Sequence, residues 1–230
     1  MSASPQPRMV EVRARILKEN DLLARQLRER YERAGVTVIS FVSSPGSGKT
    51  AFLESLMARL SADWRIAALV GDLATENDAA RLRRSCSQVK QIVTGTVCHL
   101  DAKMVGAALD EWKLDELDLL LIENVGNLVC PSSYDLGEAM RVVLLSVTEG
   151  EDKPLKYPTI FNTADVALLT KMDLAEAVEF DRAAALTNIQ SVRPGMRVLE
   201  VSTKTGQGMD AVVALVAEQI RAVRREPQPA

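Results

Sequence analysis

The sequence predicts a three-layer α/β fold, in which a mainly parallel sheet is covered by helices on both faces and follows an amphipathic helix. Short apolar runs recur along the chain, and segments that can form helices separate most of them. This alternation is the pattern of parallel strands joined by helical crossovers. With 230 residues, of which 47% are hydrophobic, the chain can bury one sizeable core. We therefore expect one globular domain.

The first expected element is a helix over residues 11–33, where apolar residues recur at helical spacing and charges fill the other face. Its apolar stripe suits packing on a domain and equally suits contact with a partner. The polar, proline-bearing ends, residues 1–8 and 226–230, are expected to be loose. We therefore expect residues 1–35 to form the tail and helix, residues 36–225 the domain, and the last five residues a short tail.

Strands are expected at seven apolar runs. In chain order they cover residues 36–42, 66–72, 89–95, 117–124, 141–147, 165–173 and 196–202. Segments with helical spacing, such as residues 49–60 and the stretch before the last tail, supply the covering layers. Ligands of such folds bind at the carboxyl ends of the strands. The residues that follow each run are therefore the candidates for chemistry.

Composition narrows the function classes. The 28 basic and 31 acidic residues give a net charge of −3, which does not suit a surface built to neutralise a nucleic acid backbone. No run reaches the ~18 apolar residues of a membrane span, and the opening segment lacks a secretory apolar stretch. We expect a cytoplasmic protein with no nucleic acid or membrane partner. In a reducing compartment its three cysteines are free thiols or metal thiolates.

The segment after the first run, SSPGSGKT at residues 43–50, matches G-x-x-x-x-G-K-[ST] except that serine replaces the first glycine. Gly46 and Gly48 let backbone N–H groups turn toward phosphates, and the following helix adds favourable partial charge. Lys49 is expected to reach the β and γ phosphates and Thr50 to bind Mg²⁺. The alternative is a glycine-rich turn with a stray lysine, but strand, loop and helix occur in the required order. This predicts a P-loop NTPase fold with nucleotide contacts from Ser44, Pro45, Gly46, Ser47, Gly48, Lys49, Thr50 and Ala51.

The segment TKMD, from Thr170 to Asp173, fits the [NT]-K-x-D pattern of guanine-specific P-loop proteins. The Asp173 carboxylate would accept from two N–H donors that adenine does not present together, and such a match can discriminate by ~10⁴ or more. Lys171 would lie along the base. A later loop, VSTKTGQG, offers Ser202 and Thr203 as further base contacts. The sequence therefore predicts GTP and GDP as the nucleotides.

Acidic residues at two other strand ends are candidates for the chemistry at the γ phosphate. Asp72 and Asp78 lie in a switch-like segment, and either could orient the attacking water; Asp78 is equally well explained as a helix-start residue. Glu123 stands where many GTPases have aspartate, and Gly126 follows it as a γ-phosphate sensor. The predicted Mg²⁺ ligands are Thr50, Asp72 and Glu123, and the predicted catalytic residues are Lys49, Asp72, Asp78 and Glu123.

The segment TVCHLD contains the only histidine, His99, directly after Cys98. Thiolate and imidazole donors suit Zn²⁺ or Ni²⁺. Free cysteines are also common as small buried hydrophobes, with a histidine capping a helix. From spacing alone, that second interpretation is the simpler one.

Several stretches together resemble the hydrogenase maturation GTPases of the HypB family, which help to insert nickel into [NiFe] hydrogenase. They are SSPGSGKT, GDLATENDA, TGTVCHLDAKMV, LLLIENVGNLVCP, DLGEAMRVVLLSVTEGEDKPLKYPTIF, LLTKMDL and STKTGQGMD, and they cover most of residues 37–210. The run from Asp135 to Phe161 is distinctive, because generic P-loop GTPases lack it.

The resemblance implies a slow GTPase that forms a homodimer with GTP and binds Ni²⁺ or Zn²⁺ through Cys98, His99 and Cys130. Three ligands leave a tetrahedral site incomplete, so a site shared between two copies is the economical arrangement. The implied partners are a nickel-delivery accessory protein and the hydrogenase large-subunit precursor. GTP binding would close the dimer and form the metal site, and hydrolysis would release the ion.

Two alternatives remain open at this point. One is a urease-accessory nickel GTPase, although its metal motif is Cys-Pro-His whereas Cys98 and His99 are adjacent. The other is a GTP-dependent scaffold that moves no metal and uses this pair only for packing. An ATP-using kinase is disfavoured by TKMD. Metal binding separates these possibilities.

Overall fold

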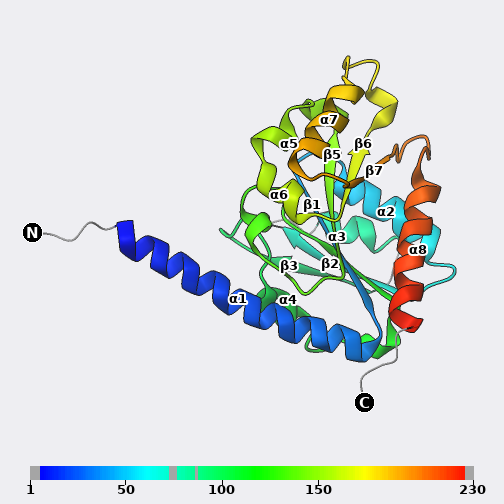
Figure 1. Cartoon of the computed structure of the whole chain (residues 1–230). Coiled ribbons are helices and arrows are strands. Elements are labelled where there is room, and N and C mark those ends of the chain that lie inside the picture. Colours follow the sequence, from blue (N-terminus) through cyan, green and yellow to red (C-terminus); the bar gives the residue numbers. More distant parts are fainter. Residues whose placement is uncertain (1–5, 73–76, 86–87, 226–230) are drawn as a thin grey trace, which may run out of the picture.

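A seven-stranded parallel sheet forms the centre of the computed structural model, which describes residues 6–72, 77–85 and 88–225. Its strand order is β3-β2-β4-β1-β5-β6-β7 (Figure 1). The strands are β1 Thr37–Ser43, β2 Ile66–Asp72, β3 Gln88–Val93, β4 Leu119–Glu123, β5 Met140–Ser146, β6 Val166–Thr170 and β7 Arg197–Glu200. The predicted three-layer fold is confirmed, and every expected apolar run overlaps a strand.

Helices cover both faces of the sheet (Figure 1). The α-helices are α1 Gln6–Ala34, α2 Lys49–Leu60, α3 Asn77–Leu82, α4 Ala102–Ala108, α5 Lys153–Lys156, α6 Pro158–Thr163, α7 Arg182–Val192 and α8 Met209–Arg225. The short 3₁₀ helices are η1 Leu114–Glu116, η2 Cys130–Ser133, η3 Val147–Glu149 and η4 Met172–Leu174. Side chains alternate across each strand. In β1, Ile39 and Phe41 pack with α2, α3 and α8, whereas Val38 and Val42 face the layer that contains α1, α4, α6 and α7.

The helix α1 begins at Gln6, so the expectation of a loose end was wrong for residues 6–8. Pro7 lies in the first turn, where its missing N–H removes no helical hydrogen bond. The other residues expected to be loose, 1–5 and 226–230, lie outside the described part of the chain.

The two halves of α1 have different surroundings. Ala24, Leu27 and Tyr31 are buried against the domain. Nearer the amino terminus, Val10 and Val12 keep 69% and 57% of their surface exposed, and this half of the helix extends away from the sheet (Figure 1). The carboxyl-terminal half therefore anchors the helix.

Strand β6 ends at Thr170, earlier than expected, because Lys171 has a left-handed backbone with φ of 59°. That conformation ends the strand and starts η4, so Asp173 lies in a short helix rather than in the sheet. In the part of the chain that the structure describes, each helix is too short or too polar to be a membrane span.

Candidate functional site

The phosphate loop joins β1 to α2 at the carboxyl edge of the sheet. Gly46 and Gly48 have φ of +74° and +92°, and Gly48 directly precedes the first residue of α2. A side chain at Gly46 would meet no atom within 4 Å, so its backbone conformation, not space, favours glycine here. The loop therefore has the left-handed turns and the helix N-terminus that anion binding requires.

Lys49, Thr50 and Glu123 meet at one point beneath this loop. Thr50 Oγ1 donates to Glu123 Oε1 at 2.6 Å, and Lys49 Nζ lies 3.3 Å from the same oxygen. Burial raises the pKa of Glu123 and the negative charge of Asp78 adds to this, while Lys49 and Thr50 oppose it. The glutamate side chain, which is longer than an aspartate, thus reaches from β4 to Lys49 and Thr50, the first two residues of α2.

The chemistry of this cluster fits a hard cation. In the described part of the chain, Glu123 Oε2 is buried without a hydrogen-bond partner, although its other oxygen is satisfied. Mg²⁺ prefers carboxylate and hydroxyl oxygens. Glu123 and Thr50 are therefore suitable Mg²⁺ ligands.

The two candidate aspartates lie in different places. Asp72 ends β2, and its carbonyl oxygen accepts from Thr94 N at 3.0 Å. Asp78 lies in the first turn of α3, and its charge acts on Glu123. Residues 73–76 of the predicted switch segment lie outside the described residues. The charge of Asp78 therefore acts on the Lys49–Glu123 pair.

The predicted base-binding segment is tied to the phosphate loop by hydrogen bonds. Thr170 Oγ1 donates to Ser47 O at 2.9 Å, and Lys171 Nζ donates to Gly46 O at 2.7 Å. These bonds give Thr170 and Lys171 a defined role in shaping the loop. The predicted base-binding and phosphate-binding residues therefore form one continuous site.

Asp173 is oriented by the loop after β7. Ser202 Oγ donates to Asp173 Oδ1 at 2.6 Å, and Lys204 Nζ lies 3.9 Å from Oδ2. Ser202 is fully buried, whereas Thr203 is exposed and makes no polar side-chain contact within the described chain. The structure therefore brings Ser202 to Asp173 and leaves Thr203 apart. Lys204 was not predicted, although it lies in the same quoted loop.

Cys98, His99 and Cys130 come together although 32 residues separate the two cysteines. The two free thiols lie 2.9 Å apart, and the donor atoms of all three residues lie within 4.8 Å of one another. Donors bound to one ion at about 2.0–2.3 Å lie at most ~4.6 Å apart. Small shifts would therefore bring all three onto one ion.

His99 is held in place by an aromatic neighbour. Its ring stacks on Tyr134 with centroids 3.9 Å apart, and its Nδ1 is buried without a partner in the described chain. Burial lowers the pKa of His99, which favours the neutral imidazole that binds metals, although Asp101 opposes this effect. The hydrogen bond with Cys98, together with burial, raises the pKa of Cys130.

The metal cluster is connected to the nucleotide site by the segment after β4. Asn124 Oδ1 accepts from the backbone N–H of Leu100, the residue directly after His99, at 3.0 Å. Asn127 Nδ2 donates to Cys98 O at 3.2 Å. Between them, a side chain at Gly126 would lie 3.0 Å from Pro45 Cα. Residues 123–127 therefore contact the predicted Mg²⁺ site, the phosphate loop and the metal cluster in turn.

A family model described as "CobW/HypB/UreG, nucleotide-binding domain" matches residues 36–200. The hydrogenase maturation factor HypB of Rhizobium leguminosarum bv. viciae is 47% identical over 220 residues, which are 96% of this chain and 73% of that protein. The chain belongs to the HypB family of hydrogenase maturation factors. The family match includes the phosphate loop, the cysteines and histidine, and Asp173, and it ends before Ser202.

Two solved HypB structures share the fold. HypB from Helicobacter pylori in complex with nickel is 42% identical, covers 92% of this chain and 99% of its own, and superposes with a TM-score of 0.84. HypB from Archaeoglobus fulgidus is 38% identical, covers 88% and 99% of the two chains, and gives a TM-score of 0.83. The resemblance predicted from the sequence is confirmed.

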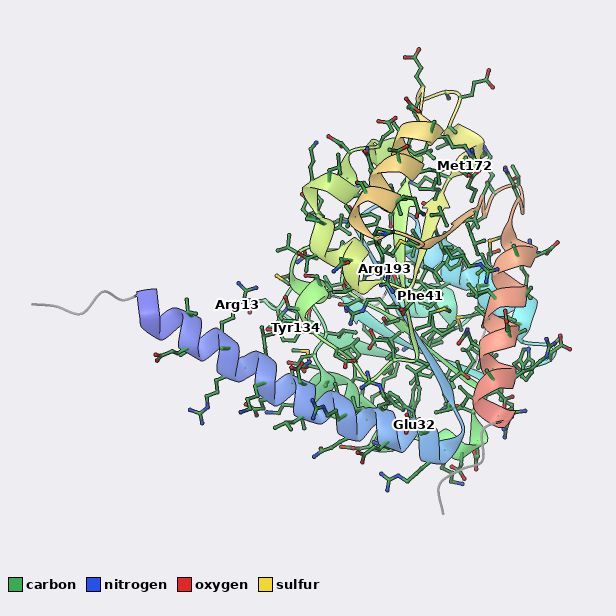
Figure 2. All side chains as sticks on the ribbon, viewed as in Figure 1. Arg13, Glu32, Phe41, Tyr134, Met172 and Arg193 are labelled. Carbon is green, nitrogen blue, oxygen red and sulfur yellow. The ribbon has the colours of Figure 1, made fainter. Side chains whose placement is uncertain are left out.

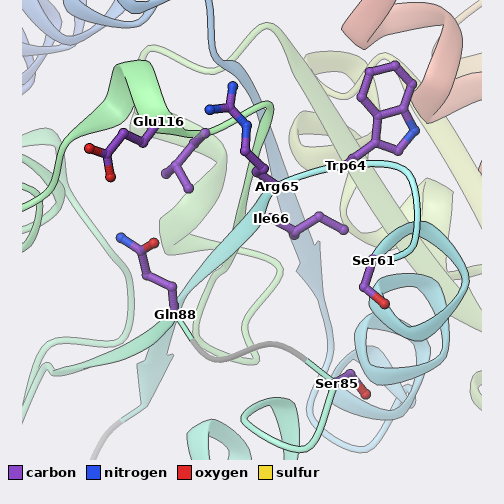
Figure 3. A pocket seen from close by; sticks show the side chains of 8 residues that line it. Ser61, Trp64, Arg65, Ile66, Ser85, Gln88 and Glu116 are labelled. Carbon is purple, nitrogen blue, oxygen red and sulfur yellow. The ribbon is translucent and has the colours of Figure 1, made fainter.

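One further pocket lies elsewhere in this HypB-family chain. It has a volume of about 480 Å³, near the amino ends of β2 and β3 (Figure 3). Its lining residues are Ser61, Trp64, Arg65, Ile66, Ser85, Gln88, Glu116 and Leu117. None of them is a predicted site residue.

Sequence reasoning missed Tyr134, Asn124 and Asn127. All three lie in or beside stretches quoted for the HypB resemblance, and asparagines directly after an apolar run are a usable signal. The partners of the two asparagines could not be found in this way, because their hydrogen bonds join segments 24 to 29 residues apart.

Proposed function

We propose that this HypB-family protein is a GTP-hydrolysing metallochaperone that assists nickel insertion into [NiFe] hydrogenase. The observation that carries the proposal is the direct connection between two sites through residues 123–127. One end of this segment contacts Thr50 and Lys49, and the other contacts the backbone of Cys98. Such a segment lets the state of the γ phosphate alter the arrangement of the metal donors.

We propose GTP as the nucleotide because the two oxygens of the Asp173 carboxylate would accept two hydrogen bonds from guanine. Ser202 donates to one of these oxygens, and this bond would orient the carboxylate for the N1–H and N2–H₂ donors of guanine. Adenine would leave this charge without a partner. Thr203, which is exposed, is proposed only as a peripheral contact.

In the proposed hydrolysis, GTP and water give GDP and phosphate. Lys49 neutralises charge on the β and γ phosphates, and the backbone N–H of Gly126 senses the γ phosphate. Thr50 and Glu123, with Asp72, would hold Mg²⁺, which supplies further charge neutralisation when bound. Asp72 or Asp78 would orient the attacking water, and the charge of Asp78 reaches Glu123.

The proposed cargo is Ni²⁺, with Zn²⁺ as the alternative ion for the same donors. Cys98, His99 and Cys130 supply three donors per chain. A homodimer formed with GTP would let two copies complete the coordination. The ion would then pass to a nickel-delivery accessory protein or to the hydrogenase large-subunit precursor.

The test is Ni²⁺ binding by the purified protein, with mass measured in solution, in GDP and in a non-hydrolysable GTP analogue. We expect binding that Cys98→Ala abolishes and that Cys86→Ala retains, because the second variant keeps all three donors. We also expect the GTP analogue to favour a metal-linked dimer. Nickel binding that is equal in Cys98→Ala and wild type would refute the metallochaperone proposal and leave a GTPase that carries no metal.

A further inference from the structure

Asn20 joins the anchored half of α1 to both segments that carry the metal donors. Its Oδ1 accepts from Ala102 N at 2.8 Å, three residues after His99. Its Nδ2 donates to Asp135 O at 2.9 Å, five residues after Cys130. Asn20 is 5% exposed, so water does not compete strongly for these two bonds. One side chain thus bridges segments that are 82 and 115 residues away in the sequence.

The two donor segments need such a bridge because neither is held in a strand. Cys98 and His99 lie in the loop between β3 and α4, and Cys130 begins the short helix η2. On the side of the nucleotide, Asn124 and Asn127 hold the first segment. Asn20 holds both segments from α1 instead.

The bridge also requires a side-chain amide at position 20, because its oxygen must accept from Ala102 N and its nitrogen must donate to Asp135 O. Ala102 N belongs to the first turn of α4, where N–H groups have no partner within the helix. The donated bond fixes the Asp135 backbone, whose side chain also pairs with Arg28 of α1 at 2.9 Å. An apolar side chain at position 20 would remove both bonds and leave the buried Ala102 N–H without this partner.

We propose that Asn20 is a positioning residue for the metal site, which sets the separation between the Cys98–His99 segment and the Cys130 segment. The inference rests on the proposed function, since it requires these three residues to bind the ion. It assigns α1 a role in the geometry of that site. Figure 2 shows Tyr134, which stacks on His99, on the same side of the molecule as the amino-terminal half of α1, marked by Arg13.

The test compares Asn20→Ala with Arg30→Ala in the full chain. Arg30 is a matched control, because it also anchors α1, through a 2.7 Å bond to Leu109 O at the far end of α4, and touches neither donor segment. Ni²⁺ affinity is measured by competition with a chromogenic chelator, together with the thiolate-to-nickel absorption band. GDP affinity is measured on the same samples.

Loss of a residue that orients metal ligands typically lowers metal affinity by 10–100-fold, so we expect Asn20→Ala to weaken Ni²⁺ binding at least about tenfold and to shift the band. GDP affinity is expected to be unchanged, and Arg30→Ala is expected to keep wild-type nickel affinity. The inference is overturned if Asn20→Ala binds nickel like wild type, or if Arg30→Ala loses as much. Wild type that binds no nickel in a Cys98-dependent way would instead refute the proposed function itself.

Asn20→Asp serves if Asn20→Ala does not fold. It keeps the acceptor for Ala102 N and removes the donor to Asp135 O, so half of the bridge remains. We expect its nickel affinity to be lower than that of Arg30→Ala. Equal affinity in these two variants would also overturn the inference.

Discussion

The substitution Ser202→Ala is expected to weaken nucleotide binding, although Ser202 does not contact the phosphates directly. Ser202 Oγ donates to Asp173 Oδ1 at 2.6 Å, within the range of charge-assisted O–H···O⁻ bonds. Such bonds contribute about 1.5–3 kcal/mol. The side chain of Asp173 is only 15% exposed, and its other contact, Lys204 Nζ, is distant at 3.9 Å. Little else therefore orients the carboxylate.

The whole bond would correspond to roughly 10- to 150-fold in affinity, since 1.4 kcal/mol is tenfold. Ser202→Ala removes this bond from the free protein as well as from the complex. The affinity therefore falls only by the part of the bond's free energy that comes from orienting Asp173 for the nucleotide. We therefore expect GDP affinity to fall about tenfold. Isothermal titration calorimetry with GDP measures this, and ADP titrations report the change in base preference.

Thr203→Ala is the matched control, because the neighbouring Thr203 is exposed and has no polar side-chain contact in the described chain. Because Thr203 is proposed only as a peripheral contact, we expect its GDP affinity to fall much less than that of Ser202→Ala. If both variants bind GDP like wild type, Ser202 does not orient Asp173 in the bound state. Equal losses in both variants would mean that the loop as a whole, and not the Ser202 bond, determines affinity.

Three further predictions concern other parts of the molecule. Gly137→Ala should destabilise the protein by about 1–3 kcal/mol more than Gly195→Ala in urea unfolding. Both glycines have positive φ, but only a Cβ at position 137 would lie 2.7 Å from a carbonyl oxygen of α1. Equal losses of stability in the two variants would argue against tight docking of α1. Glu123→Gln should abolish Mg²⁺-dependent GTP hydrolysis in a phosphate-release assay while GDP still binds in EDTA, and full hydrolysis would exclude Glu123 as a ligand. Burial raises the pKa of Asp135, but its bonds to Arg28 and Gly137 N more than offset this and hold the pKa below its usual range. The stabilisation from this shift is present above about pH 3.9, the pKa of Asp in the unfolded chain, and is lost as pH falls through the folded pKa. The unfolding free energies of wild type and Arg28→Ala should therefore differ at neutral pH and converge in acid. A difference that persists in acid would contradict this prediction.

The sequence was most informative where local patterns decide the structure. Continuous apolar runs such as residues 117–124 predict buried parallel strands, because both faces of such a strand are covered. The phosphate loop was predictable because glycine spacing and a following helix are properties of one short segment. The start of α1 was placed too late, since Pro7 was taken as a sign of a loose end although the first helical turn tolerates it.

The remaining features depend on contacts between distant segments. Ser202 and Thr203 are neighbours with similar side chains, and only the orientation of the loop separates the buried residue from the exposed one. Asn20 lies within a polar helix sequence that gives no sign of its two partners. Cys98 and Cys130 could be joined from the sequence only through the family resemblance, because spacing alone favoured packing.

The most direct test of the central claim is the Ni²⁺ affinity of the wild-type protein in GDP compared with a non-hydrolysable GTP analogue. If residues 123–127 couple the two sites, the affinities differ, and by linkage nickel changes the relative affinity of the two nucleotides by the same factor. We expect this difference to be reduced in Asn127→Ala, which loses the bond to Cys98 O. Equal nickel affinity in both nucleotide states of wild type would contradict the account.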